Sequence, residues 1–181
     1  MRKIFQFFSL LVLSCFGALG VSAQEPITAI DQTDNASAYT IKSVDRGYMV
    51  YAPSKTTTGA WCSDNTTKGS TITVDPADPN NQWMFYKIGE SYYLYNVGAE
   101  KFLYKNGNGT MLTEYDPAYT VQLLASTGDN AATHPTVIAF GDNQINLSKD
   151  QSTAVFTNWN STSDKGNTMQ IVKVADVSDD V

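Results

Sequence analysis

The stretch that decides the fold is Tyr39-Thr40-Ile41-Lys42-Ser43-Val44, followed by Met49-Val50-Tyr51. The pattern returns without a gap as Tyr92-Tyr93-Leu94-Tyr95-Asn96-Val97, followed by Phe102-Leu103-Tyr104. A third, weaker copy runs from Ile138 to Leu147, with the same nine-residue step from its first aliphatic residue to its last. Short apolar runs separated by Gly, Asn, Asp and Pro are typical of strands. Because an internal repeat determines architecture before local propensity does, the sequence predicts one threefold, all-β domain.

Each copy also ends in a related short strand. The three closing strands are Asn81–Phe85, Tyr119–Leu123 and Asn167–Ile171. Trp83, Val121 and Met169 hold the same position in them and share a face with the residue two places later, because side chains alternate along a strand. We therefore expect Trp83 to lie in the core.

A third strand is expected between the opening pair and the closing strand of each copy. Met111 and Trp159 each lie ten residues before the matching closing-strand residue, and Trp61 takes the corresponding place in the first copy. Four strands in each of three copies make twelve strands of pseudo-threefold symmetry, an organisation that resembles a β-trefoil over residues 37–174.

This organisation resembles the ricin-type β-trefoil lectins. The motif Asn81-Gln82-Trp83 approximates the Gln-x-Trp that closes each repeat in that family. The resemblance implies that Trp61 and Trp159 are platforms for a sugar ring, and that Asn80 bonds the sugar hydroxyls.

The second and third copies depart from the family pattern. Their closing strands lack the tryptophan, and Met111 stands where a second platform would be. The sugar-binding aspartate expected just after the second strand has no counterpart, since Tyr51 and Tyr104 are followed by Ala52 and Lys105. The resemblance therefore implies at most two sites, in the first and third repeats.

The chemistry of these positions suits a sugar. A flat indole offers apolar area to a pyranose, and neighbouring polar groups fix its orientation. The polar side chains expected to do so are Asp64, Asn80, Asn160 and Asp164. The sequence predicts a non-catalytic carbohydrate-binding module whose partner is a glycan or polysaccharide. Two alternatives stay open: each tryptophan caps the barrel core, or the trefoil is an inhibitor or adhesion module that binds protein through loop 64–80.

The two ends of the chain are expected to lie outside the domain. Residues 1–23 have the basic start, apolar run and small-residue exit of a signal peptide, which favours cleavage at Ala23 over lipid anchoring at Cys15. A secreted, periplasmic or extracellular location follows. Residues 24–36 are predicted to be a mobile leader and residues 175–181 an acidic tail. No other apolar run approaches the roughly 20 residues of a membrane span.

Composition excludes several other functions. The net charge is −6 and basic residues do not cluster, which argues against a nucleic acid partner. Cys62 is the only cysteine after the signal peptide, so we expect no internal disulfide. His134 is the only histidine, which supports neither a catalytic triad nor a zinc site. The sequence predicts no catalytic residue, no metal and no cofactor.

Overall fold

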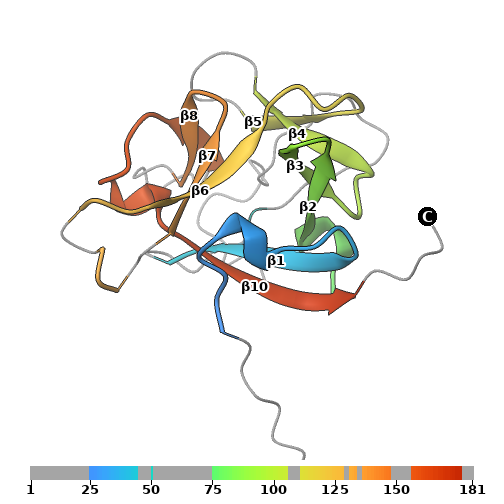
Figure 1. Cartoon of the computed structure of the whole chain (residues 1–181), viewed down its shortest axis with the longest axis horizontal. Coiled ribbons are helices and arrows are strands. Elements are labelled where there is room, and N and C mark those ends of the chain that lie inside the picture. The colour runs from blue at the N-terminus through green and yellow to red at the C-terminus, as the bar shows by residue number, and fades with distance from the viewer. Residues whose placement is uncertain are drawn as a thin grey trace, which may run out of the picture.

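The computed structural model shows short strands wound around one core, with single turns of 3-10 helix between some of them (Figure 1). The structure describes residues 25–44, 50, 75–105, 111–128, 131–133, 136–147 and 156–176. Its 3-10 helices are η1 (Ile30–Gln32), η2 (Pro79–Asn81) and η3 (Lys165–Asn167). Its strands are β1 (Ser37–Ser43), β2 (Gln82–Ile88), β3 (Ser91–Asn96), β4 (Lys101–Lys105), β5 (Met111–Glu114), β6 (Val121–Ala125), β7 (Thr136–Phe140), β8 (Asn143–Leu147), β9 (Phe156–Trp159) and β10 (Met169–Asp176).

The strand pairing repeats three times around the molecule. Each closing strand pairs with the opening strand of the next repeat: β2 with β3, β6 with β7, and β10 back with β1. Each closing strand also meets the opening strand of its own repeat, β2 with β1 and β6 with β3. A bridge between Val137 and Thr168 is the third such contact. These contacts close a ring of strands, which confirms the predicted β-trefoil and its pseudo-threefold symmetry.

The core forms where the three repeats meet. Ile41, Leu94 and Ile138 are equivalent residues of the opening strands, and each is at most 1 % exposed. The closing-strand residues Trp83, Val121 and Met169 are at most 2 % exposed, as the alternation predicts. The indole Nε1 of Trp83 donates to the carbonyl oxygen of Val50 at 2.8 Å. The prediction that Trp83 is a core residue is confirmed.

The opening hairpin of the third repeat differs from the predicted alignment. Its turn contains only Gly141 and Asp142, because Phe140 pairs directly with Asn143. The corresponding turn of the second repeat spans four residues, 97–100. Gly141 has a φ of 61°, the left-handed conformation that such a tight turn requires. This register places Ile145 opposite Ile138, so the nine-residue step to Leu147 is wrong.

The segment predicted to be a mobile leader is instead attached to the domain over most of its length. Ile27 is a member of the core cluster, and its N–H donates to the carbonyl oxygen of Ile171 at 2.8 Å. The side chain of Gln32 accepts hydrogen bonds from the N–H groups of Thr28 and Ala29. These contacts give residues 27–32 fixed partners, which corrects the expectation of mobility.

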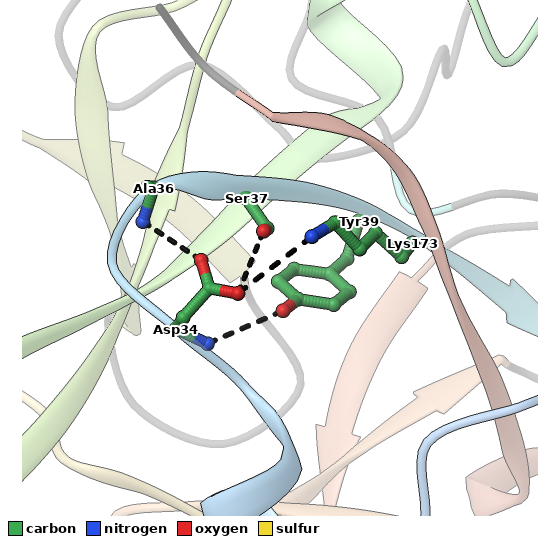
Figure 2. Close-up of polar contacts among 5 residues, drawn as sticks. All are labelled: Asp34, Ala36, Ser37, Tyr39 and Lys173. Atoms are coloured by element: carbon green, nitrogen blue, oxygen red, sulfur yellow. Dashed lines mark hydrogen bonds and ion pairs between the residues drawn. The ribbon is translucent and has the colours of Figure 1, made fainter. Parts of the chain in front are cut away.

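Asp34 fixes the end of the same segment where it enters β1 (Figure 2). Its carboxylate accepts hydrogen bonds from the N–H of Ala36 at 2.9 Å and the hydroxyl of Ser37 at 2.8 Å. The ammonium group of Lys173 on β10 lies 3.7 Å from the same carboxylate. The N–H of Asp34 donates to the phenol oxygen of Tyr39. Asp34 therefore joins the entry of the domain to its last strand.

Several predictions concern residues outside the described ranges. These are the second and third strands of the first repeat apart from Val50, and also Trp61, Cys62, Asp64, His134 and residues 177–181. Val50 itself donates its N–H to the carbonyl oxygen of Ile41 at 2.8 Å, as the predicted opening hairpin requires. Across the described ranges, no helix is long and apolar enough to cross a membrane.

Candidate functional site

Trp159 combines an exposed side chain with a firmly held backbone. It is the last residue of β9 and 58 % exposed, whereas Trp83 is fully buried. Pairing of β9 with β8 places Trp159 opposite Gln144. Its carbonyl oxygen accepts hydrogen bonds from the side-chain amide of Asn167 at 3.1 Å and the N–H of Ser161 at 3.2 Å. A large apolar surface is therefore presented to solvent from a fixed position, as a binding site requires.

An open cavity of about 220 Å³ lies beside this ring. It is lined by Trp159 and three asparagines, Asn143, Asn158 and Asn160. The side-chain amide of Asn143 donates to the side-chain oxygen of Asn158 at 2.6 Å, and both residues are buried. Each asparagine amide carries both donors and acceptors. Among the described residues, the lining of the cavity therefore consists of one apolar ring and several uncharged hydrogen-bonding groups.

A second layer of amides supports the cavity from behind. Asn167 is fully buried and links Trp159 to β8, because its side-chain oxygen also accepts from the amide of Asn146. The side-chain oxygen of Gln144 accepts from the N–H of Ser161 at 2.6 Å, which fixes the turn after β9. Such outer contacts hold a site in one geometry and limit the entropy lost on binding.

The predicted site residues of the third repeat separate into two groups. Trp159 and Asn160 both line the cavity. Asp164 does not belong to the lining; its carboxylate accepts from the N–H of Gly166 at 2.8 Å and caps η3. The position of Asp164 is that of a turn-stabilising residue.

Asn80 occupies the equivalent turn of the first repeat. Its N–H donates to the carboxylate of Asp78 at 2.9 Å, as that of Gly166 does to Asp164. Its carbonyl oxygen accepts from the side-chain amide of Asn96 at 2.9 Å. Since Trp61 and Asp64 lie outside the described residues, the site expected around Asn80 stays a prediction.

Sequence reasoning missed three asparagines of this site: Asn143, Asn158 and Asn167. The signal for Asn167 is its place two residues before Met169, which matches the place of Asn81 before Trp83. Asn143 becomes recognisable only when the third hairpin is shortened, because the turn then ends at this residue.

The second repeat has no aromatic platform at the matching place. Phe102 pairs with Glu114 as Gln144 pairs with Trp159, so Glu114 is the counterpart of Trp159. Met111 pairs three residues further along the hairpin, with Lys105. The predicted equivalence of Met111 and Trp159 is therefore wrong, because the connection to the closing strand is shorter in the second repeat.

In the second repeat, a tyrosine takes the position that a buried asparagine holds in the other two repeats. Tyr119 stands two residues before Val121, where the other repeats have Asn81 and Asn167. Its ring centroid lies 5.3 Å from that of Phe140 and 5.3 Å from that of Tyr104, both edge-to-face. Rings therefore fill the space that amides occupy behind Trp159.

Comparison with known proteins supports the fold. No protein-family model matches the chain, and no curated protein matches its sequence. Among solved structures, the chain is similar to a ricin B-like lectin of Macrolepiota procera in complex with lactose, with 18 % identity, a TM-score of 0.54, and coverage of 79 % of this chain and 99 % of the lectin. It is similar to the Rhizoctonia solani agglutinin, with 16 % identity, a TM-score of 0.52, and coverage of 77 % and 96 %.

A third similar structure is the designed threefold-symmetric protein ThreeFoil, with 12 % identity, a TM-score of 0.55, and coverage of 76 % of this chain and 99 % of the design. At these identities the similarity concerns the fold. The chain has a β-trefoil fold, as predicted from the sequence. In the described ranges, no three His, Cys, Asp or Glu side chains gather closely enough to hold a metal ion.

Proposed function

We propose that this protein is a secreted, non-catalytic carbohydrate-binding module, and that the cavity beside Trp159 binds one sugar unit of a glycan or polysaccharide. The observation that carries the proposal is the exposed indole of Trp159, which lines one cavity together with three asparagines. A pyranose has an apolar face of C–H groups and an edge of hydroxyl groups. The indole suits the face, and the asparagine amides suit the edge.

Two further observations support the class of ligand. The M. procera lectin, which shares the fold, has a structure in complex with lactose. The cavity is lined by a tryptophan and three neutral amides, which can orient hydroxyl groups but provide no general acid or base. Secretion rests on the signal-peptide pattern of residues 1–23.

A glycan array is the direct test. The purified protein, its Trp159→Ala variant and a control variant, Tyr115→Ala, are applied to the same array. Tyr115 is a matched control because its side chain is also largely exposed, at 62 %, but lies outside the cavity lining. A central aromatic contact contributes more than about 1.4 kcal/mol, so the Trp159→Ala variant should bind at least about tenfold more weakly.

The proposal expects at least one glycan signal that Trp159→Ala weakens by about tenfold or more and that Tyr115→Ala leaves unchanged. Signals that survive Trp159→Ala at full strength would place the site elsewhere. The predicted site at Trp61 of the first repeat would then be tested by substitution. Silence across the array would contradict glycan binding and favour a protein partner for the 64–80 loop.

A further inference from the structure

A second aromatic surface lies on the outer face of β2, β3 and β4. Phe102 forms its centre, with ring centroids 6.0 Å from Tyr86, 6.3 Å from Tyr93 and 5.1 Å from Tyr95. Tyr86 is 41 % exposed and the other three rings are half-buried. We call these four residues the Phe102 cluster. They lie on one face because the register pairs Tyr86 with Tyr93, and Tyr95 with Phe102.

The other two corners of the threefold fold have no aromatic residues at the described equivalent positions. The same positions at the corner of β6, β7 and β8 are held by Leu124, Val137, Ala139 and Gln144. At the corner of β10 and β1, the described positions are held by Val172, Thr40 and Lys42. Neither corner has an aromatic residue at these positions, and both pair their strands in the same register. Four rings at one corner therefore call for a functional explanation.

The chemistry of the Phe102 cluster resembles that of a sugar site more than that of an apolar docking face. Three of the four rings are tyrosines, which combine an apolar ring with a hydroxyl group. Glu114 stands next to Phe102 in the register and supplies a carboxylate that accepts from sugar hydroxyls. None of the four rings carries a charge. An apolar centre beside hydroxyl and carboxylate groups complements the face and the edge of a neutral pyranose.

The position of the cluster within the repeat points the same way. Phe102 is the counterpart of Gln144, the residue paired with Trp159 in the third repeat. The aromatic surface of the second repeat is thus displaced by one strand, from the third strand of the repeat to the second. The two aromatic surfaces therefore lie on paired strands of the corresponding hairpin in two different repeats.

From this we propose that the Phe102 cluster is a second carbohydrate-binding surface, which takes a neutral pyranose unit. The proposal shares with the proposed function only the class of ligand. It does not require a sugar in the cavity beside Trp159.

Chemical-shift mapping by NMR tests the two surfaces separately. Neutral oligosaccharides (lactose, cellotetraose, xylotetraose and mannotriose) are titrated at millimolar concentrations into the uniformly labelled protein and its Trp159→Ala variant. The proposal expects saturable shifts at the amides of residues 86, 93, 95 and 102 for at least one sugar, and expects them to persist in the variant. Tyr86→Ala should weaken this binding by about tenfold or more, as for a central aromatic contact. Leu124→Ala, at the equivalent place of another corner, should leave it unchanged.

The other outcomes distinguish the second surface from the proposed site at Trp159. Shifts confined to residues 158–160 would leave the proposed function intact and remove the second surface. Shifts confined to the Phe102 cluster would support the second surface and contradict the proposed site. If no sugar shifts the amides of the cluster in the wild-type protein, the second surface is rejected. Misfolding of a variant cannot explain that result, because the wild-type protein is used. Sedimentation that detects a dimer abolished by Tyr86→Ala would assign the cluster to a second copy of the chain.

Discussion

Replacing each of two tryptophans with alanine should have opposite consequences for stability and binding. Trp83 is fully buried in the closing strand β2 and donates a hydrogen bond to the carbonyl oxygen of Val50. Trp159 is 58 % exposed at the end of β9. The two substitutions remove the same atoms, so their difference measures the environment alone.

The magnitude for Trp83→Ala follows from its burial. Truncation of a buried tryptophan costs about 3–5 kcal/mol through lost apolar contact and the remaining cavity. The carbonyl oxygen of Val50 also loses its partner, which costs about a further 1 kcal/mol. A loss of about 4 kcal/mol or more is large against the 5–15 kcal/mol typical of a domain. For Trp159→Ala, the free energy of unfolding should change by no more than about 0.5 kcal/mol.

Urea unfolding followed by far-UV circular dichroism measures both effects without relying on tryptophan emission. With an m-value of about 2 kcal/mol/M, Trp83→Ala should lower the midpoint by about 2 M, and Trp159→Ala should leave it nearly unchanged. A loss above about 2 kcal/mol for Trp159→Ala would show that its indole caps the core. That result would refute the assignment of Trp159 to a binding surface.

Four further substitutions test contacts that hold the fold and the site. Gly98→Ala should destabilise the protein by about 1–3 kcal/mol in thermal unfolding, because a Cβ there would lie 2.6 Å from the backbone nitrogen of Asn80. Gly89→Ala has nothing within 4 Å and a φ of 60°, so its cost of about 1 kcal/mol comes from the backbone alone; an equal cost at both glycines would contradict this distinction. Asn167→Ala should lower stability by about 1–3 kcal/mol and weaken glycan binding, since the side-chain amide of Asn146 and the carbonyl oxygen of Trp159 each lose one hydrogen bond; unchanged binding would show that the amides behind the cavity do not position Trp159. Asp34→Ala should cost about 1–2 kcal/mol by urea unfolding, because the N–H of Ala36 and the hydroxyl of Ser37 lose their acceptor; no change would remove the role of Asp34 at the entry to β1.

The fold was predictable because the repeats carry the core. Ile41, Leu94 and Ile138 pack against the closing strands from the same place in each repeat, so the core places an aliphatic residue at that position in all three copies. The burial of Trp83 follows from its place in the closing strand, whereas the sequence left open whether Trp159 caps the core, and the structure shows it 58 % exposed. Turn lengths left a weaker mark: the two-residue turn at Gly141-Asp142 shifted the predicted partner of Ile138 by two positions.

The site was predictable only in part, because its polar groups come from different strands. Trp159 and Asn160 are neighbours in the sequence, and both line the cavity. Asn143 and Asn158 meet there only through the pairing of β8 with β9, which sequence spacing does not reveal. Asp164 was expected to contact the ligand, yet its carboxylate bonds the local backbone, a common role for aspartate in turns. The leader was expected to be mobile because it is polar, but Ile27 lies in the core cluster and Ile30 packs against it.

A fluorescence titration tests whether a sugar binds on the indole of Trp159. The chain has three tryptophans, so a Trp61→Phe variant keeps only the buried Trp83 and the exposed Trp159. The glycan with the strongest array signal is titrated into this variant, with binding measured in parallel by calorimetry. If the sugar binds at Trp159, we expect a saturable blue shift of the tryptophan emission, because a sugar stacked on Trp159 removes its indole from water. Binding by calorimetry with no change in emission would contradict the assignment of the sugar to Trp159.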